Sequence, residues 1–244
     1  MKTGIYWQDP KYALRPGQGF IFDPSLVLYL PLHRLAGASF MSRDKHGHLC
    51  TVTGALWRPD GRSFDGEDDY IEMPDFAAYK ELNGKDLSSF VWFRTSLDVN
   101  TNFRLLIGTY TTLTLGPPTP NQSWVLGYGH NSDPNQNVVL CNCRRDNAAE
   151  TVNAEGTTQV NDGNWHYGGF VKRGLDIEAW VDGVKEDTAS LTQDGNTDNN
   201  QKLRLGVTYA RYLDALISLV MIYNRALTPL EIQRNYLAAK WRYQ

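Results

Sequence analysis

Two segments in the second half of the chain constrain the fold most. Residues 164–184, N-W-H-Y-G-G-F-V-K-R-G-L-D-I-E-A-W-V-D-G-V, predict two antiparallel strands. Residues 222–236, I-Y-N-R-A-L-T-P-L-E-I-Q-R-N-Y, predict a strand that runs into a short capped helix. Together these segments indicate a β-sandwich, and they favour binding or assembly over chemistry performed by a catalytic group.

Short strand-like runs recur along the rest of the chain. The dipeptides Asp60-Gly61, Asp65-Gly66, Asp182-Gly183 and Asp194-Gly195 separate several of them and are typical of tight turns. Strands and helices do not alternate, which excludes an α/β fold. We therefore predict an all-β fold, an antiparallel two-sheet jelly-roll sandwich with a short C-terminal helix. The predicted strands begin with L-V-L-Y-L-P-L at Leu26 and include residues 63–65, 70–73, 89–95, 104–109, 124–129, 138–143, 166–172, 177–181, 203–207 and 216–223.

The helix is predicted over residues 229–241. Thr228 is a suitable N-cap, Pro229 suits the first helical position, and Glu231 completes a T-x-x-E capping box. Its apolar side is expected to contain Leu230, Ile232, Tyr236 and Leu237.

The first 25 residues differ from the remainder. They lack periodicity but carry aromatic side chains, which disordered segments usually lack. We interpret residues 1–25 as an N-terminal aromatic arm and residues 26–244 as one jelly-roll domain. The N-terminus shows no secretory signal. We expect a virion or an extracellular surface as the location.

Charge and cysteine content narrow the partners. The net charge is −3 and the basic residues are scattered, so neither nucleic acid nor a membrane is an expected partner. Cys141 and Cys143 lie on one face of a predicted strand. They form either half of a metal site or two small core residues. We favour core residues and predict no metal, because no second Cys or His pair with zinc-like spacing accompanies them.

Four stretches in order carry a family resemblance: L-V-L-Y-L-P-L, residues 54–74 (G-A-L-W-R-P-D-G-R-S-F-D-G-E-D-D-Y-I-E-M-P), residues 164–184, and residues 219–232 (L-V-M-I-Y-N-R-A-L-T-P-L-E-I). With them the chain resembles the laminin-G-like jelly-roll modules of the concanavalin A-like lectin/glucanase superfamily, from about Leu26 to Tyr236. The resemblance implies binding of glycans or proteins, with calcium in some members. The family's last strand commonly reads I-D-E-V-x-I-Y, whereas Ser218 and Leu219 stand at the acidic positions here, so we expect no cofactor.

The last predicted strand is apolar on both faces. By alternation Ile217, Leu219, Met221 and Tyr223 share one face, while Ser218, Val220 and Ile222 share the other. The outer face is therefore covered by the arm, by the terminal helix or by a neighbouring subunit. Our hypothesis is that the arm packs on this sheet, in the same chain or in a partner. The predicted assembly residues are Tyr6, Trp7, Tyr12, Phe20, Phe22, Leu219 and Met221. Trp165 is expected to point into the sandwich interior.

Sugar sites on such sandwiches use exposed aromatic rings, amides and charged groups. The predicted ligand-binding residues near the long loop are Asn121, Gln122, Trp124 and Tyr128. A second group, in the turn between the last two predicted strands, comprises Tyr209, Arg211 and Tyr212. Trp124 and Tyr128 have a second interpretation as core or sheet-surface residues.

A glycosidase is the remaining alternative. Glu67, Asp69 and Glu72 fit the spacing E-x-D-x-x-E of superfamily glucanases, and Glu67 and Glu72 would be the two carboxylates of a retaining enzyme. They follow directly on the Asp65-Gly66 turn, so we predict no enzyme. The predicted function is a non-catalytic binding or assembly module of a surface structure, such as a virion decoration, a fibre or a cell-surface assembly, with self-association or other subunits as partners and possible glycan recognition. The alternatives are a free carbohydrate-binding lectin and, less favoured, a retaining glucanase.

Overall fold

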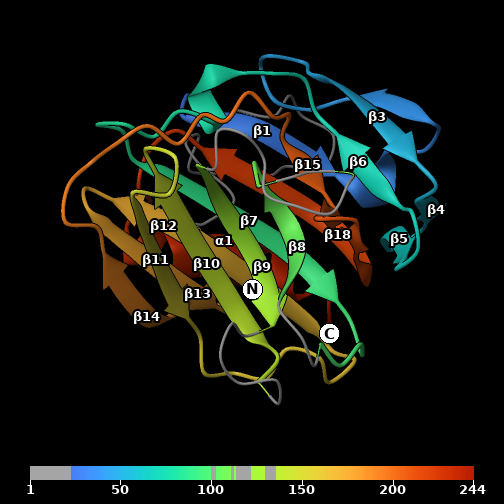
Figure 1. The fold of residues 1–244 in the computed structure, drawn as a ribbon. Helices are drawn as coiled ribbons and strands as arrows, with labels where there is room; N and C mark the ends of the chain where they lie inside the picture. The colour runs from blue at the N-terminus through green and yellow to red at the C-terminus, as the bar shows by residue number, and fades with distance from the viewer. Residues whose placement is uncertain (1–22, 100–102, 111–112, 114–121, 130–135) are drawn as a thin grey trace.

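Two antiparallel sheets face each other across a hydrophobic core (Figure 1). The structure is a computed structural model, and it describes residues 23–99, 103–110, 113, 122–129 and 136–244. The predicted arm residues Tyr6, Trp7, Tyr12, Phe20 and Phe22, and the predicted ligand residue Asn121, lie outside the described residues. The two sheets and the single described α-helix confirm the predicted fold class.

Sheet A carries the N-terminal strand and the predicted late strands. Its spatial order is β14 (Val184–Ser190), β13 (Asp176–Val181), β12 (Trp165–Arg173), β7 (Leu87–Arg94), β18 (Asp214–Tyr223), β5 (Gly61–Asp65) and β4 (Leu56–Arg58), with β1 (Leu26–Pro31) also paired to β18. The turn between β13 and β14 is formed by Asp182 and Gly183, whose φ values of 49° and 83° suit a tight hairpin.

Sheet B lies opposite. Its order is β11 (Glu150–Glu155), β10 (Val138–Arg145), β9 (Ser123–Gly129), β8 (Phe103–Gly108), β15 (Arg204–Leu205), β6 (Tyr70–Glu72), β3 (Leu49–Thr53) and β2 (Ser39–Met41). The predicted strand at 203–207 divides at Gly206, which has a φ of 87°, and continues as a hairpin of β16 (Val207–Thr208) and β17 (Arg211–Tyr212). Two short 3-10 helices are η2 (Leu32–Arg34) and η3 (Ala77–Tyr79).

The inner faces of the two sheets form the main core. Trp124 of β9 is fully buried, its ring centroid lies 5.3 Å from that of Phe170 on β12, and its Nε1 donates to the Tyr79 carbonyl at 2.6 Å. Cys141 and Cys143 are free thiols in this core. Burial raises the pKa of Cys143 to about 12, so its sulfur is a neutral thiol in this core.

Strand β18 contains a bulge that changes the predicted face assignment. Its pairing with β7 shifts between Ile217 and Leu219, so Ser218 is an extra residue. Ile217 consequently joins Val220 and Ile222 in the main core, while Leu219, Met221 and Tyr223 lie on the outer face of sheet A. The strand is apolar on both faces as predicted, but the placement of Ile217 with Leu219 was wrong because strict alternation fails across a bulge.

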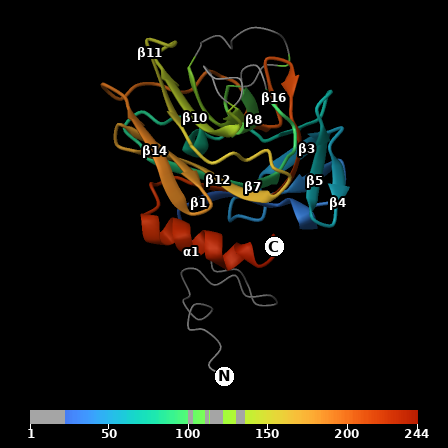
Figure 2. The same ribbon diagram turned by 90° about the horizontal axis from the view of Figure 1, so that it is seen from below.

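Helix α1 (Pro229–Lys240) covers that outer face (Figure 2). The capping box is present: Glu231 N donates to the Thr228 hydroxyl, and Thr228 N donates to the Glu231 carboxylate at 2.9 Å. Ile232 is fully buried against the sheet, and Tyr243, beyond the helix, stacks on Trp92 with centroids 4.2 Å apart. The terminal helix, one of the three predicted covers, therefore buries Leu219 and Met221 within the same chain.

Two further expectations were wrong. Leu230 and Leu237 are exposed rather than part of the buried side of α1. Trp165 packs on the outer face of sheet A and not in the interior. It is the first residue of β12, where His166 and not Trp165 takes the inward position beside Phe93. No helix among the described residues is long and apolar enough to cross a membrane.

Candidate functional site

Beyond the end of α1, the outer face of sheet A carries a row of neighbouring side chains from five strands. The strand register places Leu56 beside Ser63, Ser63 beside Leu216, Leu216 beside Arg94, and Arg94 beside Trp165. Their sequence neighbours Phe64, Phe93 and Ala215 face the main core, so this row points outward. The row therefore brings together residues that are far apart in the sequence.

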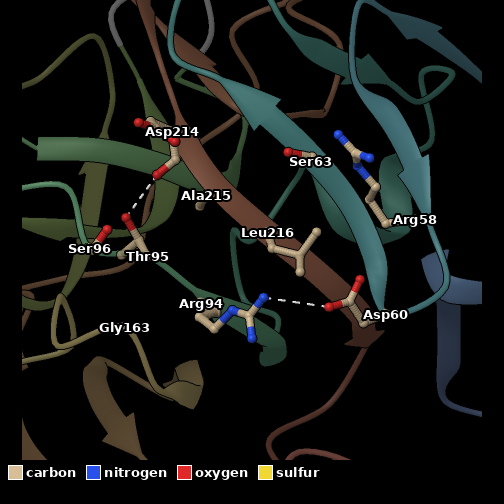
Figure 3. A pocket seen from close by; sticks show the side chains of 10 residues that line it. All are labelled: Arg58, Asp60, Ser63, Arg94, Thr95, Ser96, Gly163, Asp214, Ala215 and Leu216. Carbon is tan, nitrogen blue, oxygen red and sulfur yellow. Dashed lines mark hydrogen bonds and ion pairs between the residues drawn. The ribbon is translucent and has the colours of Figure 1, made fainter.

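A cavity of about 400 Å³ lies on this row. We call it the sheet A groove. Figure 3 shows its lining residues, which come from β4, β5, β7, β18 and the segment before β12. They are Arg58, Asp60, Ser63, Arg94, Thr95, Ser96, Gly163, Asp214, Ala215 and Leu216. This volume falls within the range of about 300–1,000 Å³ usual for small-molecule sites.

Arg94 is held across the groove by two neighbours. One guanidinium nitrogen lies 3.5 Å from a carboxylate oxygen of Asp60, and the guanidinium carbon lies 5.2 Å from the centroid of the Trp165 ring. Both side chains of the ion pair remain nearly half exposed, so the groups are free to contact a ligand. Trp165 is itself packed against Tyr243, with centroids 4.9 Å apart, which fixes the ring beneath Arg94.

Opposite charges balance in the groove. Arg58 and Arg94 contribute two positive charges, and Asp60 and Asp214 contribute two negative charges. Thr95 donates its hydroxyl hydrogen to the Asp214 carbonyl at 2.8 Å, as Figure 3 shows. Donors and acceptors thus surround the half-buried side chain of Leu216. Such a lining suits an uncharged ligand that has many hydroxyl groups and small apolar patches.

A comparison with known protein families identifies the superfamily to which the chain belongs. A model of the concanavalin A-like lectin/glucanases superfamily matches residues 65–233, more than half of the chain. The chain belongs to this superfamily. No curated protein matches the sequence.

Solved structures with the same fold include two toxin binding domains and one enzyme domain. The binding domain of Paraclostridial Mosquitocidal Protein 1 matches with a TM-score of 0.67 at 13% identity, and the receptor binding domain of botulinum neurotoxin D matches with 0.64 at 12%. Each match covers 88% of this chain and 52% of the other, so the chain spans about half of these domains. Domain 4 of AbnA, a GH43 extracellular arabinanase from Geobacillus stearothermophilus solved with arabinotriose, matches with 0.59 at 14% identity, over 86% of this chain and 97% of that domain. At these identities the likeness shows a shared fold.

Some superfamily members bind calcium, and three carboxylates meet after β5. One ligand atom each from Asp65, Asp68 and Asp69 lies within 4.8 Å of the others. Carboxylate oxygens suit Ca²⁺. Burial, together with the charges of Asp65, Asp68 and Glu67, raises the pKa of Asp69 to about 6, a cost that a cation would relieve. The residues present therefore fit a calcium ion at this turn. The prediction of no cofactor rested on Ser218 and did not consider this turn, and calcium binding here is untested.

Ser218, which stands where the family's last strand has an aspartate, has a structural role in this chain. The Ser218 hydroxyl accepts a hydrogen bond from the Tyr243 hydroxyl at 3.1 Å, so it helps to hold the end of the chain on sheet A.

The three carboxylates of the glucanase alternative lie in different surroundings. Glu67 is exposed in the turn, whereas Asp69 is buried and accepts a hydrogen bond from Asp65 N at 3.0 Å. Glu72 lies on β6 and pairs with Lys202 and with Arg204 at 2.7 Å. Burial raises the pKa of Glu72, but the hydrogen bonds from these two cations outweigh it and lower the pKa. A general acid needs a raised pKa, so Glu72 fits an ion pair better than proton donation.

Three of the four predicted ligand residues near the long loop lie among the described residues, and all three are buried. Trp124 and Tyr128 are fully buried in the main core, which leaves no ring face exposed, so their interpretation as core residues is the one that the structure supports. Gln122 is also buried, and its side chain contacts the Asp198 carbonyl and Asn147 N. Trp124 and Tyr128 share one face of β9, and the sequence does not show whether that face is inner or outer, because every residue of the strand is buried.

The second predicted group does come together, on the β16–β17 hairpin. Tyr209 has a φ of 50°, and its ring lies edge-on to Tyr110 with centroids 4.8 Å apart. The Arg211 guanidinium lies 5.4 Å from the Tyr209 ring centroid, and Tyr212 is half-buried on the same hairpin. Tyr209, Arg211 and Tyr212 stay predicted ligand residues.

Sequence reasoning missed the groove residues. Asp60 was considered only as part of a turn, and Arg94 only as part of a strand. The available signal was the change from apolar to polar side chains at the end of β7 and at the start of β18. That signal does not reveal that the two ends are neighbours, which follows only from the strand register.

Proposed function

We propose that this chain is a non-catalytic binding module that holds a neutral saccharide in the sheet A groove. The observation that carries the proposal is the convergence of Arg58, Asp60, Arg94 and Asp214 around one cavity with balanced charge. Each sugar hydroxyl both donates and accepts, so a lining that mixes guanidinium donors with carboxylate and hydroxyl acceptors suits it. Membership of a lectin-containing superfamily and the likeness to an arabinanase domain solved with arabinotriose also support the proposal.

A binding experiment tests the groove directly. The chain is screened on a glycan array that includes neutral oligosaccharides such as arabinotriose, and the best binder is titrated by calorimetry. Losing hydrogen bonds to a charged side chain costs about 1.5–3 kcal/mol, so Arg94→Ala and Asp60→Ala are each expected to weaken binding by at least about tenfold. Arg43→Ala, an exposed arginine between β2 and β3, serves as the matched control.

The outcomes separate binding from catalysis and from other sites. Undiminished binding by the Arg94 and Asp60 variants would move the site elsewhere, with the Tyr209 hairpin as the next place to test. Release of reducing ends from the bound oligosaccharide, lost in Glu67→Gln or Glu72→Gln, would contradict a non-catalytic module.

The role of this module in a surface assembly of a virion or cell is a second proposal. Leu219 and Met221 no longer support it, because α1 covers them within the same chain. The aromatic residues of the arm remain as its support. Light scattering over a range of protein concentrations tests self-association, and a monomer throughout would contradict it.

A further inference from the structure

Two arginines come together where the β16–β17 hairpin packs against β8. Arg104 lies on β8 and Arg211 lies on β17, and both strands of the hairpin contact β8 (Figure 2). Phe103 and Leu105 pack in a cluster apart from the main core. By alternation Arg104 therefore points to the same side as Tyr128, its partner on β9, whose ring belongs to the main core.

The side chain of Arg104 has buried donors that nothing accepts. Its Nε and Nη1 are buried and have no hydrogen-bond partner among the described residues. Burial lowers the pKa of Arg104, Tyr128 raises it, and the nearby positive charge of Arg211 lowers it as well. A buried guanidinium that lacks a partner and lies beside a like charge is strongly unfavourable, because proteins normally supply buried charges with hydrogen bonds and a counter-charge.

No carboxylate of the described residues neutralises these two arginines. Arg145 and Arg225 each pair with carboxylates, as buried or half-buried arginines usually do. Neither Arg104 nor Arg211 forms an ion pair within the described part of the chain. Asp214, which is close to Arg211 in sequence, lines the sheet A groove instead. The pair of arginines therefore carries positive charge that the fold itself leaves uncompensated.

Tyrosine rings complete the surroundings of this pair. The guanidinium carbon of Arg211 lies 5.4 Å from the centroid of the Tyr209 ring, which is half-buried. The Tyr209 ring lies edge-on to Tyr110, with centroids 4.8 Å apart, and this contact holds it in place beside the guanidinium. A sugar ring can pack on a tyrosine while its charged group contacts a guanidinium, so this arrangement suits an acidic saccharide.

We propose that Arg104 and Arg211 bind an oxyanion, the carboxylate or the sulfate group of an acidic saccharide. The anion relieves the repulsion between the two guanidinium groups, and its oxygens accept hydrogen bonds from the unpartnered N–H groups of Arg104. This site is separate from the sheet A groove, where positive and negative side chains balance. It therefore does not depend on the function proposed for the groove.

Thermal unfolding and calorimetry test the site. Sodium sulfate or sodium glucuronate replaces sodium chloride at constant ionic strength, and glucose is the neutral counterpart of glucuronate. A ligand that binds only the folded chain raises the melting temperature. We expect a saturable rise with sulfate or glucuronate and none with glucose. The affinity should fall at least about tenfold in Arg104→Met and in Arg211→Gln. Arg43→Gln, at an exposed arginine between β2 and β3, should respond as the parent does.

The arms of the experiment also distinguish the source of the charge. A rise with glucuronate alone would identify a carboxylated saccharide, whereas a rise with sulfate would identify a sulfate group. A melting temperature that depends on ionic strength alone would overturn the proposal. A rise that both arginine variants retain would overturn it too. If Arg104→Met does not fold, Arg211→Gln decides the result, because this half-buried hairpin residue is not part of the main core.

Discussion

Asp69 gives the sharpest test of the electrostatics. Its side chain is 3% exposed, and Gly54 packs so closely that an added Cβ would lie 1.6 Å from one carboxylate oxygen. Burial, with the nearby charges of Asp65, Asp68 and Glu67, raises the pKa of Asp69 from 3.8 to about 6. The folded state thus prefers the protonated carboxyl. The contribution of the protonated Asp69 carboxyl to the unfolding free energy is fully present below about pH 4 and is lost as the pH rises through about 6.

Two pKa units correspond to about 3 kcal/mol of unfolding free energy. In Asp69→Asn the amide stays neutral and keeps an oxygen for Asp65 N. We therefore expect this variant to exceed the parent by up to about 3 kcal/mol at pH 8, and to match it near pH 3.5. For a chain of this size that equals a rise in melting temperature of up to about 6–12 °C.

The assay is thermal and urea unfolding at pH 3.5, 6 and 8 in buffer containing EDTA. Glu67→Gln is the control: it removes an exposed charge from the same turn, and because that charge is the smallest of the causes that raise the Asp69 pKa, it should give only a small part of the gain. If Asp69→Asn gave no gain at pH 8, Asp69 would ionise in the fold as it does in the unfolded chain, and the argument would be refuted. A gain that persisted unchanged at pH 3.5 would also refute it, because the gain would then not depend on ionisation.

Three further outcomes are expected. Millimolar calcium should raise the melting temperature of the parent at pH 7.5 and should have little effect on Asp65→Asn, as measured by calorimetry. Ile232→Ala should lower the unfolding free energy by about 3 kcal/mol in urea denaturation, because the side chain is fully buried beneath α1. Burial lowers the pKa of His166, but hydrogen bonds and charges from Asp182 and Asp162 outweigh it and raise the pKa. The stabilisation of the fold by protonated His166 and its two aspartate partners is therefore complete below pH 6.5, and it is lost as the pH rises through the raised pKa. His166→Gln should flatten the pH dependence of stability in that window.

Local features of the fold were predicted from the sequence because they depend on nearby residues. The capping box at Thr228 satisfies backbone groups of its own helix, so three residues suffice to locate it. Asp182-Gly183 likewise forms a turn by its own backbone preference. The doubly apolar character of the last strand correctly indicated a covered outer face.

The candidate site could not be predicted in this way. Trp124 and Trp165 are both tryptophans at or near the start of a strand, yet the first is in the core and the second is on the outer face. One extra residue at Ser218 reassigns the face of Ile217, and a sequence of apolar residues does not mark the position of a bulge.

The sequence by itself determined two layers of antiparallel strands and a capped terminal helix, since turn residues, periodicity and caps act over a few neighbouring residues. Only the tertiary structure decided that α1 lies across sheet A and that Arg94 meets Asp60 and Leu216 in a groove. Those contacts depend on the register of strands distant in sequence, and register is set by how all the buried faces fit together at once.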